Sequence, residues 1–141
     1  MVREKYKSFD VLIEIPRGSR NKYEYDFKLK RIRFDRMLFS SMMYPADYGF
    51  MPQTLALDGD PLDVLVLINE PTFPGCVMEV KPIGVFHMAD DKGPEEKIIC
   101  VPVSDPIWNS LENLSDINQH LLKEIEHFFQ VYKDLENKQV D

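Results

Sequence analysis

Three carboxylates fall within six residues in the segment Asp58-Gly59-Asp60-Pro61-Leu62-Asp63, directly before an apolar run from Val64 to Ile68. Glycine and proline bend a loop so that several oxygens can converge, and hard divalent cations such as Mg²⁺ take oxygen ligands. Carboxylates held this close repel one another, so a cation is their natural counter-charge. A turn whose Asp side chains only cap backbone amides is the simpler alternative. The number of carboxylates in one Gly/Pro loop favours a cation site.

A second acidic cluster, from Asp90 to Lys97, has the same layout: a loop containing Gly93 and Pro94 that leads into an apolar run. Taken alone, it is typical of a solvated charged loop. Because the arrangement occurs twice, we expect the two acidic loops to line one pocket beside two buried strands.

Two familiar carboxylate motifs can be tested against the first loop by spacing. An EF-hand that starts at Asp58 needs Gly at its sixth position and Glu at its twelfth, where this chain has Asp63 and Asn69. A phosphatase with an aspartyl nucleophile is the better rival, because Leu55 to Leu57 imitates the strand that precedes such an Asp. Here, however, the longer apolar run follows the loop, and no pattern of alternating strands and helices comes after it.

Cationic and phenolic side chains supply the complement to the carboxylates. Arg binds phosphate oxygens bidentately, Lys binds them as a point charge, and a phenol donates a hydrogen bond. Each of these residues is weak evidence on its own, and Tyr132 also fits the apolar stripe of a helix. The candidates for binding an anionic substrate are Lys22, Arg36, Lys97, Lys133, Tyr44, Tyr48 and Tyr132.

Short strands followed by one helix must position these residues. Tyr23, Tyr25 and Phe27 alternate with acidic residues, which predicts a strand with one buried face. Apolar residues recur at threes and fours from Ile117 to Leu135, which predicts an amphipathic helix with Ser115 or Asp116 as its N-cap. The pattern indicates an α+β domain built on a small barrel. The predicted strands are Val11–Ile15, Tyr23–Phe27, Ile32–Phe34, Val64–Ile68, Val77–Phe86 and Ile98–Val103.

Length and charge narrow the classes of function. A chain of 141 residues is the size of one domain, 1–141. Its formal net charge of -7 repels nucleic acid and anionic membranes, so we expect neither as a partner. An acidic protein that acts on an anionic substrate needs cations between the two. The first ten residues lack an apolar stretch, which predicts a cytoplasmic protein.

Taken in order, these segments resemble the family I soluble inorganic pyrophosphatases, in their shorter bacterial form. The signature segment is DGDPLDVLV (Asp58 to Val66). The resemblance covers nearly the whole chain and implies a five-stranded OB-like barrel with helices outside, which hydrolyses pyrophosphate with several Mg²⁺ ions. It also implies a homo-oligomer, usually a hexamer. The other matching segments are IEIPRGSRNKYEYD (Ile13 to Asp26), FDR (Phe34 to Arg36), YPADYGF (Tyr44 to Phe50), the loop from Asp90 to Lys97, and HFFQVYKDLE (His127 to Glu136).

The resemblance also implies a role for each matching residue. Asp60 would be the general base, and Tyr44 would support the pocket. The metal ligands would be Asp58, Asp63 and Glu95 for the tightest ion, with Asp90, Glu14 and Glu24 for further ions, and the substrate-binding residues would be Lys22, Arg36, Tyr48, Lys97, Tyr132 and Lys133.

Two departures from the family pattern stand out. The family has Asp at the position of Glu95, and an extra methylene shifts a ligand in a site that Mg²⁺ holds to octahedral geometry, so we expect weaker magnesium binding and some help from Mn²⁺. The chain ends at Asp141, where most bacterial members continue into another helix. A catalytically impaired shortened relative and a non-catalytic OB-type binding module are therefore the alternatives to an active enzyme.

Overall fold

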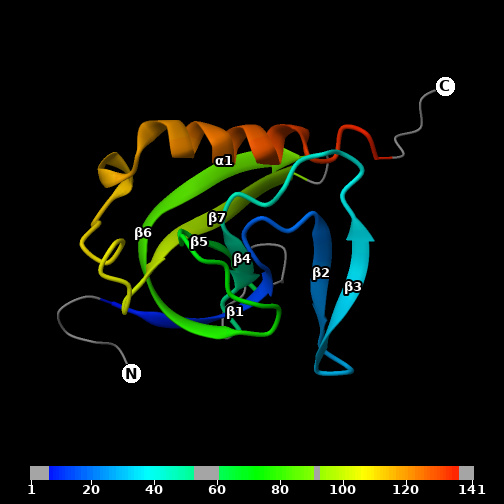
Figure 1. The fold of residues 1–141 in the computed structure, drawn as a ribbon, viewed down its shortest axis with the longest axis horizontal. Coiled ribbons are helices and arrows are strands. Elements are labelled where there is room, and N and C mark those ends of the chain that lie inside the picture. Colours follow the sequence, from blue (N-terminus) through cyan, green and yellow to red (C-terminus); the bar gives the residue numbers. More distant parts are fainter. Residues whose placement is uncertain (1–6, 53–60, 91–92, 137–141) are drawn as a thin grey trace.

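The computed structural model describes residues 7–52, 61–90 and 93–136, with the backbone alone at Asp90 (Figure 1). Within these residues, one α-helix and one short 3₁₀ helix follow the strands. The elements in chain order are β1 (Phe9–Ile15), β2 (Asn21–Asp26), β3 (Arg31–Met37), β4 (Asp47–Phe50), β5 (Asp63–Val66), β6 (Val77–Asp90), β7 (Gly93–Pro102), the 3₁₀ helix (Leu114–Asp116) and α1 (Gln119–Val131).

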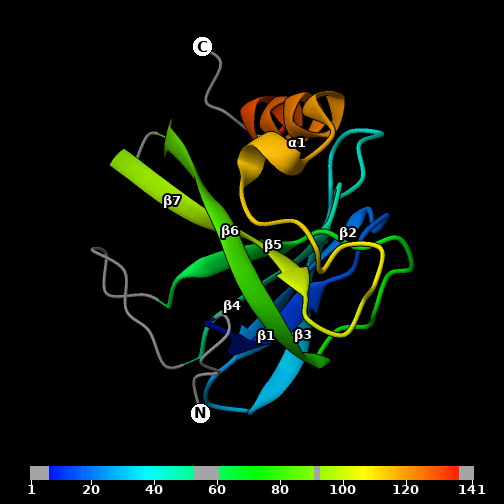
Figure 2. The same cartoon turned by 90° about the vertical axis from the view of Figure 1, so that its left-hand side faces the viewer.

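Five strands close into a barrel in the order β1-β4-β5-β7-β6. All neighbouring pairs are antiparallel except β5 and β7, which run parallel with Asp63 opposite Lys97. The 14 residues of β6 let it pair with β1 at one end and with β7 along the rest. Figures 1 and 2 show α1 lying across the outside of this barrel. The predicted α+β fold, a small five-stranded barrel with an amphipathic helix outside, is confirmed.

The core follows from the strand and helix periods. Val11, Ile13 and Ile15 alternate inward along β1 and are fully buried. Ile125, Phe128 and Phe129 recur at threes and fours on α1 and belong to the same core cluster as Ile15. The helix therefore buries its apolar face against the barrel.

Strands β2 and β3 form a two-stranded sheet of their own. The hairpin stands beside the barrel in Figure 1. The expected buried face of Tyr23, Tyr25 and Phe27 is only partly present, because both tyrosines are half-buried and Phe27 is 60% exposed. The barrel covers this face only in part: the ring centroids of Tyr25 and Phe27 lie 5.9 and 5.6 Å from that of Phe50 in β4.

The helix begins later than predicted. Its N-cap is Asn118, whose side chain accepts hydrogen bonds from the backbone N–H groups of His120 and Leu121, so the prediction of Ser115 or Asp116 was wrong. Asp116 instead completes the capping box of the 3₁₀ helix. No helix within residues 7–52, 61–90 and 93–136 is long and apolar enough to cross a membrane.

Candidate active site

Lys97 is the centre of the candidate site. The parallel pairing of β5 and β7 sets it beside Asp63, and the two-residue period of β7 puts Glu95 on the same face. Its Nζ lies 2.8 Å from the Tyr48 hydroxyl, 3.0 Å from Oε1 of Glu95 and 3.4 Å from Oδ2 of Asp63. Asp63 and Glu95, one from each acidic segment, therefore meet at one buried ammonium group.

Aromatic rings complete the surroundings of this ammonium group. Lys97 is 3% exposed, and its Nζ lies 5.0 Å from the ring centroids of both Tyr48 and Phe129. A buried charge is costly unless it is paired, and ring faces add an attractive electrostatic contribution. Because Phe129 belongs to α1, the helix helps to hold the Lys97 ammonium group in place.

Three tyrosines of the site stay protonated at neutral pH. Burial raises the pKa of Tyr132 to about 12, and burial also raises the pKa of Tyr44. Burial, followed by the nearby Asp63 carboxylate, raises the pKa of Tyr48 well above its ordinary value. Tyr44 packs between the other two, with centroid distances of 5.6 Å to Tyr48 and 6.4 Å to Tyr132. Each phenol therefore keeps its O–H group as a hydrogen-bond donor.

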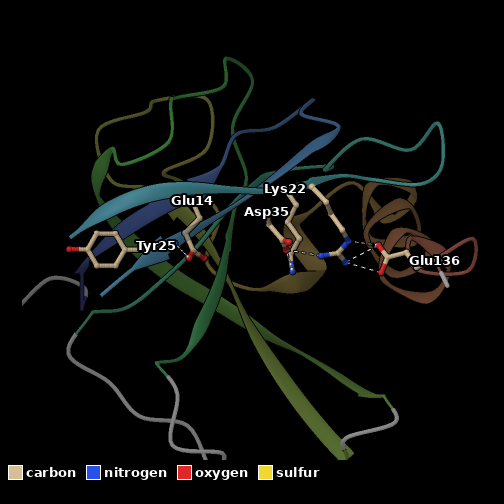
Figure 3. A network of polar contacts seen from close by, with 6 residues as sticks. Glu14, Lys22, Tyr25, Asp35 and Glu136 are labelled. Carbon is tan, nitrogen blue, oxygen red and sulfur yellow. Dashed lines mark hydrogen bonds and ion pairs between the residues drawn. The ribbon is translucent and has the colours of Figure 1, made fainter. Parts of the chain in front are cut away.

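Glu14 on β1 faces the hairpin, and its Oε2 accepts a hydrogen bond of 2.8 Å from the backbone N–H of Tyr25 (Figure 3). Burial raises the pKa of its carboxyl to about 7, and the charges of Asp63 and Glu24 raise it further, against the lowering effect of the Tyr25 hydrogen bond. The charged form of Glu14 therefore lacks sufficient compensation, which is the electrostatic signature of a site that would welcome a cation.

A chain of ion pairs runs from the hairpin to the end of the helix (Figure 3). Lys22 and Arg36 are cross-strand partners in β2 and β3. Oδ2 of Asp35 lies 3.3 Å from Nζ of Lys22 and 2.6 Å from Nη1 of Arg36. On its other side, the Arg36 guanidinium donates to both carboxylate oxygens of Glu136, at 2.8 and 2.9 Å.

Lys133 and Tyr132 sit at the C-terminal end of α1. Tyr132 is the C-cap, and the Nζ of Lys133 lies 5.5 Å above its ring. The predicted substrate-binding residues therefore lie on three parts of the fold. The hairpin carries Lys22 and Arg36, the end of α1 carries Tyr132 and Lys133, and the barrel carries Tyr48 and Lys97.

The other predicted carboxylates of the site are Asp58, Asp60, Asp90 and Glu24. Asp58 and Asp60 lie outside the described residues, and so does the side chain of Asp90, whose backbone pairs with Gly93. Glu24 is exposed on β2. Among the residues that the structure describes, no three His, Cys, Asp or Glu side chains form a group that could hold a metal ion. Asp63, Glu95 and Glu14 nonetheless offer the oxygen donors that Mg²⁺ prefers.

Sequence reasoning did not select Asp35, Phe129 or Glu136. Asp35 lies next to Arg36, and Phe129 was assigned to the apolar stripe of the helix and not to the site. Glu136 is 100 positions from Arg36, so no local pattern joins the two. Its only signal is its place at the end of the segment from His127 to Glu136.

Comparisons with known proteins agree with this geometry. The family model described as inorganic pyrophosphatase matches residues 11–141. An inorganic pyrophosphatase of Methanosarcina acetivorans is 68% identical over 92% of this chain and 77% of its own length. The inorganic pyrophosphatase of Thermus thermophilus has a TM-score of 0.91 and 46% identity, over 95% of this chain and 77% of that one. One from Coxiella burnetii has a TM-score of 0.88 and 47% identity, over 92% and 79%.

Proposed function

Because the chain belongs to the inorganic pyrophosphatase family, we infer that it hydrolyses inorganic pyrophosphate to two molecules of orthophosphate. One observation carries the assignment at the level of the site. The buried Lys97 ammonium meets Asp63, Glu95 and Tyr48 where the two acidic segments enter the barrel. This site holds both a lysine ammonium group and carboxylates. It therefore suits a polyanionic substrate that arrives with divalent metal ions.

The metal that we propose is Mg²⁺, with Mn²⁺ as a possible substitute. The donor set fits a hard cation, because it consists of carboxylates and because Glu14 has an unfavourable charged form. Bound Mg²⁺ would supply Lewis acidity, which polarises the phosphoryl group and acidifies water. The residues that would hold the ions are Asp58, Asp63 and Glu95 for the tightest, with Asp90, Glu14 and Glu24 for the others.

Residues of the chain itself would bind the substrate and move the proton. A water oxygen attacks one phosphorus atom in line, the bridging P–O bond breaks, and the water proton passes to Asp60 as general base. Lys22, Arg36, Lys97 and Lys133 would neutralise charge on the phosphoryl oxygens. The protonated phenols of Tyr48 and Tyr132 would donate hydrogen bonds to the same oxygens, with Tyr44 packed behind them.

The catalytic assignment is tested by phosphate release. We expect release from pyrophosphate with Mg²⁺, loss of release with excess chelator, and little release from ATP or a phosphomonoester. Activity that survives complete chelation would contradict the metal requirement. Rapid hydrolysis of the monoester would favour the aspartyl-nucleophile class, and no release from pyrophosphate would favour the non-catalytic alternatives.

Two substitutions separate the proposed base from a proposed ligand. Asp60→Asn should lower kcat by about 10² to 10⁴ and leave metal affinity nearly unchanged, because a general base contributes that much in rate. Asp63→Asn should weaken metal binding as well as turnover. Calorimetric titration of Mg²⁺ into both variants checks this, and equal losses of affinity would show that the base is assigned to the wrong residue.

Three further properties belong to the same proposal. We propose that the chain is a single domain, that it acts in the cytoplasm, and that it forms a homo-oligomer, with a hexamer as the expected size. The exposed apolar side chains at the end of β3 and in the loop after it support self-association.

A further inference from the structure

The pair between Arg36 and Glu136 is a bidentate contact of the candidate site for which the pyrophosphatase assignment gives no role. Glu136 accepts from Nε of Arg36 at 2.9 Å and from Nη2 at 2.8 Å, and the two side chains are 25% and 18% exposed (Figure 3). Both carboxylate oxygens take part. This is the bidentate geometry that fixes a guanidinium in direction as well as in position.

Stability alone is a weak explanation of this contact. Ion pairs that water reaches contribute little to folding, because solvent screens them and two long side chains lose rotamer freedom. The effect of this contact on the orientation of the Arg36 side chain is larger. An arginine has five N–H groups, and the two carboxylates of Glu136 and Asp35 leave a hydrogen on Nη1 for a further oxygen.

The position of the pair within the fold explains why the orientation of the Arg36 guanidinium matters. Arg36 and Lys22 lie on the hairpin, which is outside the barrel, whereas Tyr132 and Lys133 lie at the end of α1. A substrate that must contact both elements binds well only when the two are held at the right separation. Glu136 follows α1 in the chain and binds Arg36 of the hairpin, so it connects the two elements.

We propose that Glu136 is a positioning residue for substrate binding: it holds the Arg36 guanidinium toward the phosphoryl pocket and fixes the hairpin to the end of α1. This inference rests on the proposed function, in which Arg36 binds a phosphoryl group. The opposite role, in which Glu136 occupies the place of a phosphoryl oxygen and competes with substrate, predicts the opposite change in KM.

The test compares Glu136→Ala, Glu136→Gln and Glu136→Asp with the control Glu126→Ala, an exposed glutamate of α1. At saturating Mg²⁺, the Ala variant should raise KM for pyrophosphate about tenfold, the factor expected when one long side chain must be ordered again at each binding event. Its kcat should stay within about threefold. The Asp variant keeps the charge and should recover part of the loss, and the control should match the unmodified protein.

Two further measurements separate positioning from a general structural effect. The affinity for methylenediphosphonate, a non-hydrolysable analogue, should fall by the same factor as KM rises. In an Arg36→Gln background, Glu136→Ala should add almost nothing, because a residue that acts through Arg36 has no effect without it.

The outcomes are distinct. A KM that is unchanged or lower in the Gln and Ala variants, or a full tenfold effect in the Arg36→Gln background, would overturn the positioning role. If the Ala variant does not fold, the isosteric Gln variant decides by the same criteria. An unmodified protein that fails to hydrolyse pyrophosphate contradicts the proposed function, while analogue binding still tests Glu136.

Discussion

At the scale of single residues, the site is organised around unbalanced charges. Lys97 offers one positive charge to Asp63 and Glu95 together, so its neighbourhood keeps a net negative charge. Burial raises the pKa of Glu14, and the charges of the nearby Asp63 and Glu24 raise it further. Divalent cations would relieve both excesses, and they would then attract the polyanionic substrate that an acidic protein otherwise repels.

The Glu14 carboxyl should make the metal-free protein sensitive to pH. Its pKa rises from 4.5 to about 7 on folding, so the folded state binds more protons within this window, and stability falls as the pH rises through it. Glu14→Gln removes the titrating carboxyl, and with it this loss of stability at higher pH. In excess chelator, we expect the variant to be more stable than the unmodified protein by about 1 to 3 kcal/mol above pH 7, and equally stable near pH 4.5. Urea unfolding at both values checks this, and a pH-independent difference would rule it out.

Glu95 bears on metal affinity. Its Oε1 pairs with Lys97 at 3.0 Å, so a single carboxylate must serve both the lysine and the proposed ion. We expect Glu95→Asp to lower the Mg²⁺ concentration for half-maximal activity and to leave the saturated rate within about tenfold, or about 1.4 kcal/mol of barrier. Mn²⁺ should help the unmodified protein more than it helps the variant. Weaker magnesium binding in the variant would mean that the loop is adapted to glutamate.

Which contacts of the site can be predicted from the sequence depends on how many positions separate the two residues along the chain. Asp63 and Glu95 are predicted by local carboxylate density, and the strand register then brings them together at Lys97. The Arg36 and Glu136 pair is invisible in the sequence, because 100 positions separate its members and both types are common on surfaces. Contacts between distant elements need the fold before they can be seen.

At the scale of elements, the barrel closes through a strand that the sequence did not predict. Strand β4 has only four residues, one of them glycine, and it follows a loop containing Pro45, so its composition is typical of a turn. For the hairpin of β2 and β3, the sequence predicted the strands but not that they form a separate sheet. Its residues alternate like those of a barrel strand, because the two-residue period reports a strand and not the sheet to which it belongs.

Gly49 shows why β4 has this composition. A Cβ atom at Gly49 would lie 1.9 Å from the backbone oxygen of Leu12 in β1, so no larger residue fits without separating the two strands. We expect Gly49→Ala to lower the free energy of unfolding by about 3 kcal/mol or more, or to prevent folding. Gly84→Ala is the matched control, because the three atoms nearest to its Cβ would all belong to the Leu114 side chain, the first at 2.3 Å. Adding Leu114→Ala should recover much of the loss at Gly84, and a Gly49→Ala protein of normal stability would contradict the argument.

At the scale of the whole molecule, apolar side chains are exposed over a short stretch of the chain. Phe34, Met37, Phe39 and Met43 are between 46% and 57% exposed within ten residues. Isolated exposed apolar residues are ordinary, but several in one segment of a protein with net charge -7 are a reason to expect that another copy covers them. This is the physical reason to expect self-association independently of any relative.

Sedimentation equilibrium at micromolar concentration tests this expectation. We expect a mass several times the 16.5 kDa of one chain, with six copies as the predicted size. Changing Phe39 and Met43 together to Lys should shift the protein toward smaller species, because like charges would then face one another across the contact. Ile107→Lys makes the same kind of change at a residue that is 64% exposed, in the segment after β7, and should leave the mass unaltered. A monomer for the unmodified protein would exclude the oligomer, whereas equal dissociation by both changes would show that charge in general, and not this segment, controls assembly.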